Sequence, residues 1–264
     1  MTSQQNPAPV DRRLAVNAAL NALASQSADF SLAVARFQTC LDRSVIGQKT
    51  GQDAGLQGHC KLVICEPCQR VRFLEERTEL LSRVRAVYDR SLHTSIMSVT
   101  LSSPVVTLHE IGNHVDRMIL AWSRLVERKS FQSVTAGFAR VVRLEVDMEK
   151  NAAICHTSIL MIAERSHAFH SEEAWKAAWF SIGRSCQEDR VSYFHAIAHE
   201  DPAATARLEA EVDRIAYIGV DPLELCEFVD TTPTCDPVKL GHVLHALKGR
   251  KLIRTGRNFK RKAF

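Results

Sequence analysis

The sequence predicts an α+β fold in which helices pack on one face of an antiparallel sheet. Between residues 93 and 225, segments with β-like and helical patterns follow one another in the order β-α-β-β-α-β-α. The long helix expected between the first and second strands permits a split β-α-β arrangement. A helical, cysteine-rich segment precedes this region, and a short helix with a basic tail follows it.

Each expected element rests on a local pattern. In the segment at 69–91, apolar residues recur at helical spacing with Arg and Glu on the other faces. The strand-like run SIMSVTL stops at Pro104, and Ser171 is a good N-cap followed by two glutamates. In chain order we expect helices within 13–37, a helix at 69–91, a strand at 95–101, a helix at 106–129, a hairpin at 137–163 that turns at Glu149–Asn151, a helix after Ser171, a strand at 191–198, and helices at 202–217 and 240–247.

These elements divide the chain of 264 residues into four parts. We expect a disordered N-terminus at 1–12, a helical and cysteine-rich segment at 13–92, the main domain at 93–225, and a C-terminal helix with a basic tail at 226–264.

Composition narrows the class of protein. Hydrophobic residues make up 45% and charged residues 24% of the chain, as in ordinary globular proteins. No apolar run reaches the length of a membrane span, and the polar N-terminus lacks the core of a secretory signal. We therefore expect a cytoplasmic protein without a membrane partner. In that reducing compartment the eight cysteines are expected to be metal ligands or buried thiols and not disulfides.

The positive charge is concentrated at the C-terminus. The net charge is +4, but the last seventeen residues hold eight basic residues and no acid, and the remainder is net negative. Such a segment suits a phosphate backbone, although a solvated tail without a ligand has the same composition. The candidate DNA-binding residues are Lys248, Arg250, Lys251, Arg254, Arg257, Lys260, Arg261 and Lys262.

The cysteine-rich segment indicates a metal site. Cys65 and Cys68 form a Cys-x-x-Cys knuckle, and Cys60 precedes it by five residues. Zinc takes four nitrogen or sulfur ligands, so either His59 or Cys40 would complete the set. The alternative is a group of unrelated thiols before a helix.

Two further places could carry chemistry. His156 and Ser158 lie two residues apart on a strand and therefore share a face, and hairpin pairing could bring Glu145 beside His156. One imidazole and one carboxylate form a minimal metal or acid/base pair, although a lone strand histidine is more often structural. Tyr217 ends a helix that carries Glu211, and an activated phenolate can attack phosphorus; the alternative role is packing.

The order of seven passages shows a wider resemblance, from about Cys40 to Lys260. They are CKLVICEPCQRVR at 60–72, SVTLSSPVV at 98–106, AWSRLVERKSFQSVTAGFARVVRLEVDMEKN at 121–151, ICHTSILMIAERS at 154–166, SEEAWKAAWFSIGR at 171–184, AEVDRIAYIGVDP at 210–222 and LKGRKLIRTGRNFK at 247–260. In this order they resemble the Rep proteins that initiate rolling-circle plasmid replication, members of the His-hydrophobic-His endonuclease superfamily.

This resemblance implies a ferredoxin-like sheet that binds Mg²⁺ or Mn²⁺ at its centre. It also implies a tyrosine that nicks one strand of single-stranded or hairpin origin DNA, remains attached through a phosphotyrosine and rejoins the strand, with host replication proteins as further partners. His156 matches the first metal histidine, Thr157 and Ser158 replace the rest of that motif, Glu145 matches the metal carboxylate, and Glu211 matches a catalytic acid.

The family tyrosine follows a basic residue directly, whereas here Ile215 follows Arg214 and Tyr217 is the nearest tyrosine. The resemblance thus leaves two hypotheses: an initiator that nicks and rejoins origin DNA, or a catalytically weakened member that acts as a DNA-binding accessory or regulator. A generic zinc-containing interaction module is the hypothesis outside this family.

Overall fold

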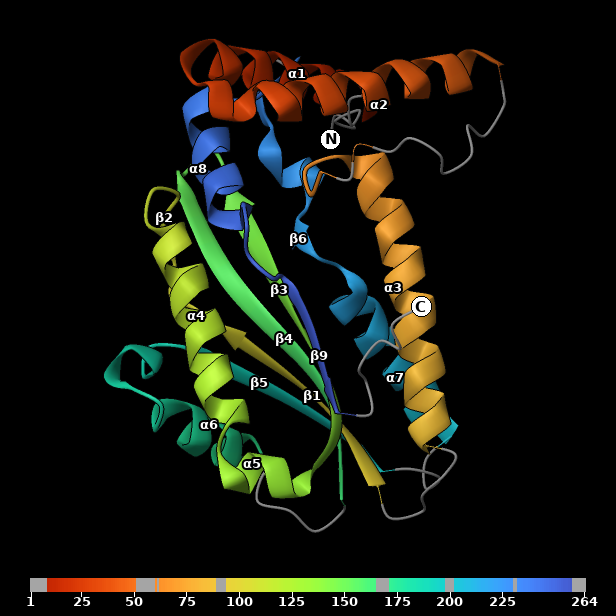
Figure 1. Cartoon of the computed structure of the whole chain (residues 1–264), viewed down its shortest axis with the longest axis vertical. Helices are drawn as coiled ribbons and strands as arrows, with labels where there is room; N and C mark the ends of the chain where they lie inside the picture. Colours follow the sequence, from red (N-terminus) through yellow and green to blue (C-terminus); the bar gives the residue numbers. More distant parts are fainter. Residues whose placement is uncertain are drawn as a thin grey trace, which may run out of the picture.

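A seven-stranded sheet forms the centre of the molecule (Figure 1). The computed structural model describes residues 9–50, 60, 62–88, 94–164, 171–197, 202–229 and 232–257. Its helices are α1 (Pro9–Gln26), α2 (Ser31–Thr50), α3 (Glu66–Tyr88), α4 (Ile111–Val126), α5 (Lys129–Val134), α6 (Glu172–Phe180), α7 (Pro202–Ala216) and α8 (Pro237–Leu247). Its strands are β1 (Thr94–Ser102), β2 (Val106–Thr107), β3 (Thr135–Asp147), β4 (Ala152–Glu164), β5 (Arg190–Ile197), β6 (Gly219–Val220), β7 (Glu227–Val229), β8 (Thr232–Thr234) and β9 (Ile253–Arg257). Short 3₁₀ turns lie at Ala28–Phe30, Arg184–Cys186 and Pro222–Leu225.

The four longest strands form the expected split β-α-β arrangement. They lie in the order β5-β1-β4-β3, and each neighbouring pair is antiparallel. Helix α4 connects β1 to β3, and α6 connects β4 to β5. This order is the ferredoxin-like one, and the α+β prediction is therefore confirmed. The outer edge of β3 is covered by antiparallel β9 along its first half and by parallel β6 further on.

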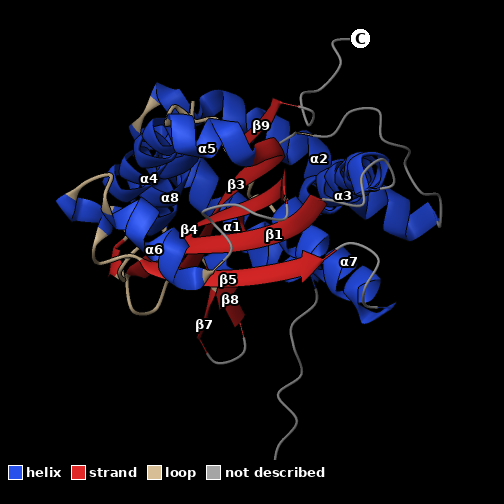
Figure 2. Ribbon diagram, turned by 90° about the horizontal axis from the view of Figure 1, so that it is seen from below, coloured by secondary structure: helices blue, strands red, loops and turns tan. Residues whose placement is uncertain are grey.

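Helices cover both faces of this sheet. The crossover helices α4 and α6 lie on one face, as the one-face expectation requires, whereas α7, with α3 beside it, lies on the other (Figures 1 and 2). Strand β3 shows the consequence, because it is buried at every position from Gly137 to Val142 and alternates between buried and more exposed residues only from Arg143 to Asp147. The prediction that helices cover only one face of the sheet is thus corrected, because α7 packs on the opposite face.

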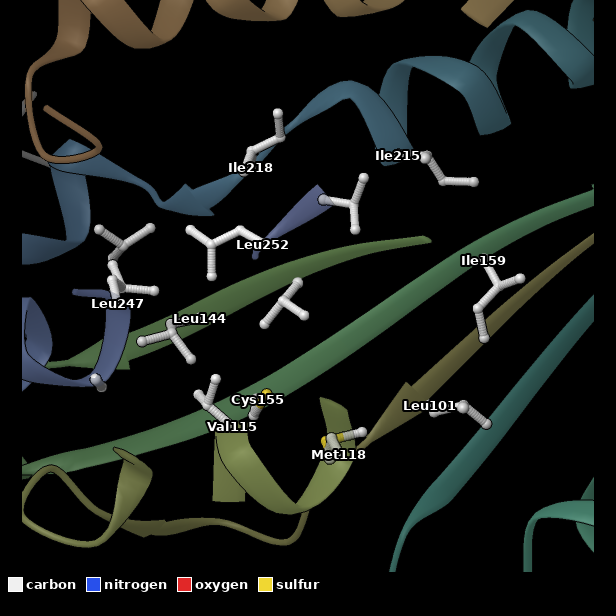
Figure 3. Close-up of a cluster of buried hydrophobic side chains, with 14 of the residues drawn as sticks. Leu101, Val115, Met118, Leu144, Cys155, Ile159, Ile215, Ile218, Leu247 and Leu252 are labelled. Carbon is white, nitrogen blue, oxygen red and sulfur yellow. The ribbon is translucent and has the colours of Figure 1, made fainter. Parts of the chain in front are cut away.

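Aromatic and aliphatic side chains fill the space between the sheet and α4. Trp122 of α4 makes edge-to-face contacts with Phe131 and Phe138, at ring-centre distances of 5.5 and 5.4 Å. Figure 3 shows Val115 and Met118 on the α4 side of β3 and β4, with Ile215 and Ile218 on the opposite side. The sheet therefore has an apolar layer on each face.

The hairpin between β3 and β4 turns where the sequence predicts. Asn151 has a φ of 53°, in the left-handed region that asparagine tolerates better than most residues. The backbone N–H of Lys150 donates to Asp147 Oδ1 at 2.9 Å, and this bond closes the turn. The hairpin register pairs Arg143 with His156 and Val141 with Ser158.

The two ends of the chain differ from the expected division. Helix α1 begins at Pro9, inside the segment 1–12 expected to be disordered, and residues 1–8 lie outside the described part. At the C-terminus, β9 joins the central sheet and is not part of a separate tail. Gly256 faces Phe138, where a Cβ atom would lie 2.2 Å from the ring, so glycine permits this close pairing.

Candidate functional site

His156 lies on the α7 face of the sheet, between a hydroxyl and a carboxylate. Its Nδ1 atom is 2.8 Å from Ser102 Oγ, and its Nε2 atom is 3.0 Å from Glu145 Oε2. Because the carboxylate only accepts, Nε2–H donates to Glu145 and the Ser102 hydroxyl donates to Nδ1. The predicted pairing of Glu145 with His156 across the hairpin is confirmed.

Burial controls the charge of this histidine. Desolvation lowers the pKa of His156 below its ordinary value, and the hydrogen bond and charge of Glu145 only partly oppose that shift. The ring is therefore neutral at neutral pH. A neutral ring can also carry its proton on Nδ1 and donate to Ser102, which would leave the Nε2 lone pair available for a cation.

Ser158 shares the face of His156, as predicted, but its hydroxyl belongs to a network centred on Arg214. Arg214 Nη1 donates to Ser158 Oγ at 2.9 Å and also to Thr100 Oγ1. Its Nη2 atom donates to Ser98 Oγ and, at 2.6 Å, to Glu211 Oε2. Glu211 therefore anchors Arg214, and Arg214 occupies the space beside the second position of the metal motif.

These side chains line a pocket between the sheet and α7, with a volume of about 390 Å³. The pocket combines five hydroxyl groups, two arginines, two glutamates and one histidine. Its lining residues are Ser98, Thr100, Ser102, Arg143, Glu145, His156, Ser158, Ser192, Glu211 and Arg214. A pocket rich in donors, with charges of both signs, suits a charged polar ligand and not an apolar one.

Tyr217 does not belong to the described lining of this pocket and lies behind Arg143. The Arg143 guanidinium, which lines the pocket, stacks over the Tyr217 ring at 5.2 Å. Phe73 contacts the ring at a centroid distance of 6.5 Å. Burial, together with Asp221, raises the pKa of the phenol above its ordinary value, so the hydroxyl stays protonated. The role of Tyr217 as the nucleophile stays a prediction.

The remaining described tyrosine side chain points away from the pocket. Tyr193 follows Ser192 on β5, and neighbouring residues of a strand face opposite sides of the sheet. Because Ser192 lines the pocket, Tyr193 lies on the α4 face.

Arg143 and Arg214 were missed by the sequence reasoning. The sequence does hold one signal for a polar pocket here. Ser98, Thr100 and Ser102 alternate along one strand and so place a row of hydroxyl groups on one face, where charged partners are expected.

A second cluster brings four cysteine thiols together at the start of α3. The Sγ atoms of Cys40, Cys60, Cys65 and Cys68 lie within 4.8 Å of one another, and all four residues are buried. The Cys40–Cys65, Cys40–Cys68 and Cys60–Cys68 distances are 3.6, 3.7 and 3.4 Å. Of the two candidates for the fourth position, Cys40 fills it, and His59 lies outside the described residues.

The basic C-terminal residues differ in whether another side chain of the protein contacts them. Arg250 is fixed by Asp116 through two contacts of 2.6 Å, and Lys248 lies 3.5 Å from Asp29. Lys251 is exposed, Arg254 is exposed and donates from Nη1 to Ser123 Oγ at 3.1 Å, and Arg257 ends β9. Lys260, Arg261 and Lys262 lie outside the described residues. DNA binding by this group stays a prediction.

Comparison with known proteins agrees with the order of the sequence passages. No curated protein matches the chain. No described helix is long and apolar enough to cross a membrane. A family described as "Replication protein" matches residues 56–263, which include the cysteine knuckle, the hairpin with His156 and the helix with Arg214. Because this match covers more than half of the sequence, the chain belongs to the rolling-circle plasmid replication protein family, and its role lies in plasmid replication.

Proposed function

We propose that this replication protein binds single-stranded or hairpin origin DNA with one backbone phosphate in the His156 pocket. The observation that carries the proposal is that two arginines and five hydroxyl groups line one pocket of about 390 Å³. Guanidinium and hydroxyl groups are common partners of phosphate oxygens, and they bind the backbone without reading the base sequence.

The charge balance of the pocket calls for a divalent cation beside the phosphate. Arg143 and Arg214 are each bound to a glutamate, at 3.2 and 2.6 Å, and Glu145 adds a third carboxylate beside neutral His156. Two arginines and three carboxylates leave these protein groups with a net charge of −1, which does not favour a phosphate. A cation at Glu145 would make the pocket positive and attract the DNA backbone.

The residues present fit Mg²⁺ or Mn²⁺ through two protein ligands, His156 Nε2 and Glu145 Oε2. The hydroxyl of Ser158, which stands at the second histidine position, already accepts a hydrogen bond from Arg214. A site with so few protein ligands is typical of magnesium sites that are completed by phosphate oxygens and water. When bound, the cation supplies charge neutralisation and orientation of the phosphate. We therefore expect cation and DNA to bind cooperatively.

The pocket favours the hypothesis of a DNA-binding accessory or regulator over that of a nicking enzyme. Nicking requires a nucleophilic oxygen that attacks phosphorus while the 3′ oxygen leaves and takes up a proton. The described α7 side chains that line the pocket are Glu211 and Arg214, and neither is a tyrosine; the Tyr217 phenol lies behind Arg143 with a raised pKa. Nicking stays a second candidate because Tyr217 contacts Arg143, which lines the pocket.

A covalent-adduct experiment distinguishes these two functions. The protein is incubated with Mn²⁺ and a labelled single strand from the origin of its plasmid, and one sample is analysed on a native gel, another on a denaturing gel. We expect a shifted complex on the native gel and no adduct on the denaturing gel.

An adduct that is lost in Tyr217→Phe and kept in Tyr193→Phe would establish nicking and overturn the binding-only hypothesis. Absence of a complex on the native gel would contradict the proposal that the pocket binds DNA.

A further inference from the structure

The cysteine cluster has the dimensions of a site for one metal ion. A tetrahedral Zn²⁺ with metal–sulfur bonds of about 2.3 Å places its ligand sulfurs about 3.8 Å apart. Three of the sulfur–sulfur distances in the cluster, 3.4 to 3.7 Å, are close to that separation. Sulfurs that bind a multi-iron cluster stand further apart, because the cluster itself lies between them. The set of four buried thiolates therefore fits a single zinc ion.

The four ligands come from three separate parts of the chain. Cys40 lies in α2, Cys60 precedes a short loop, and Cys65 and Cys68 flank the first turn of α3. In Figure 1, α1 and α2 cross above the upper end of α3, where this helix begins. A metal bound by all four would therefore hold α2 against the start of α3.

The residue after the last cysteine connects the cluster to the segment that follows α7. The Gln69 side chain is buried, and its Nε2 atom donates to the backbone oxygens of Ile218, at 2.8 Å, and Val220, at 3.3 Å. Gly219 lies between them with a φ of +84°, and a Cβ there would come within 3.1 Å of Val63 Cβ. Glycine thus lets the loop between Cys60 and Cys65 lie directly on β6.

Helix α3 also holds α7 along its length. Arg77 of α3 forms an ion pair with Asp213 of α7, and Arg85 lies 3.0 Å from Glu209. Glu211 and Arg214, which line the pocket, lie on the same helix α7. A shift of α3 would therefore move the side chains that face the proposed phosphate.

We propose that Cys40, Cys60, Cys65 and Cys68 bind one Zn²⁺, and that this centre fixes α3 and Gln69 so that α7 presents Arg214 to the pocket. Zinc here is structural and takes no part in chemistry, because four protein sulfurs leave no open coordination position. Gln69 is a positioning residue, since it acts through the backbone of 218–220.

The site is tested first by metal analysis of the purified full chain. We expect about one zinc per chain, which a mercurial reagent releases and added Zn²⁺ restores. Cys68→Ser should lose most of this zinc, whereas Cys186→Ser, which changes a buried cysteine outside the cluster, should keep it. A wild-type chain that neither contains zinc nor takes it up would overturn the metal site.

Hydrogen exchange tests the link to α7 without using DNA. Removal of zinc should accelerate amide exchange in 211–220 by about tenfold or more, because α3 no longer holds this segment. Gln69→Met should keep the zinc and still accelerate exchange there. Gln132→Met, which removes a similar donor from α5 to the backbone carbonyls of Val126 and Glu127, should leave the exchange rates of 211–220 unchanged. Equal exchange rates with and without zinc would overturn the positioning role.

DNA binding is the last measurement and rests on the proposed function. Zinc-free protein and Gln69→Met should bind single-stranded DNA about tenfold more weakly than the wild type. If no form of the protein bound DNA, the phosphate pocket would be wrong, while the zinc content and the exchange rates would still decide the inference about the cysteines.

Discussion

Replacing Arg214 by methionine removes the centre of the pocket network while it keeps an aliphatic stem of similar length. In the wild type the guanidinium binds the hydroxyls of Ser98, Thr100 and Ser158 and the carboxylate of Glu211. The hydroxyls can turn toward water or one another, since Thr100 Oγ1 and Ser158 Oγ are already 3.5 Å apart. Among the residues that the structure describes, Arg214 is the only side chain bound to Glu211, whose side chain is only 21% exposed.

The unpaired carboxylate sets the magnitude of the effect. A hydrogen bond to a charged group contributes about 1.5–3 kcal/mol, but the partial exposure of both side chains reduces this value. We therefore expect Arg214→Met to lower the free energy of unfolding by about 1–2 kcal/mol. Adding Glu211→Gln should recover part of the loss, because the second change removes the unpaired charge.

Urea denaturation followed by the fluorescence of the three buried tryptophans measures these free energies. Arg128→Met is the matched control, because Arg128 hydrogen-bonds Ser181 on an exposed surface away from the pocket. The reasoning is refuted if Arg214→Met is no less stable than Arg128→Met, or if Glu211→Gln destabilises both backgrounds equally.

Three other predictions follow from the fold and the site. In an NMR titration, His156 should show a pKa below its ordinary value, and Glu145→Gln should lower the pKa further by removing the neighbouring negative charge; a rise would contradict this sign. Deletion of 258–264 removes three basic residues but no part of β9. It should reduce the slope of log affinity for single-stranded DNA against log salt concentration by up to about 2 units, and an unchanged slope would exclude contacts between these residues and DNA. Gly256→Ala should destabilise the protein by about 1–3 kcal/mol, because the new methyl group meets the Phe138 ring; unchanged stability would contradict the close packing.

Long elements with a clear period could be predicted from the sequence. The hairpin at β3 and β4, its turn and the crossover helices are each specified by local patterns that the tertiary fold keeps. Strands β2, β6, β7 and β8 have only two or three residues, too few to show a period. The sequence predicts a basic tail where β9 forms, because the basic residues conceal the strand pattern and the place of β9 in the sheet depends on the edge of β3.

The candidate site could be predicted only where its residues are close in sequence or on paired strands. His156, Ser158 and Glu145 belong to one hairpin, so the register alone brings them together. Arg214 belongs to a helix whose orientation against the sheet depends on α3 and on packing that no local pattern records. The same limit left His59 and Cys40 as equal candidates, because Cys40 is twenty residues from the nearest other ligand.

The central claim is that DNA and a divalent cation occupy the His156 pocket together, and Mn²⁺ electron paramagnetic resonance tests it most directly. Free Mn²⁺ gives a strong signal that is lost on binding, so the fraction bound can be measured with and without a single-stranded origin oligonucleotide. We predict weak Mn²⁺ binding by the protein alone, binding at least about tenfold tighter with DNA, and loss of this gain in His156→Ala. Equal Mn²⁺ affinity with and without DNA, or a gain that survives His156→Ala, would contradict the claim.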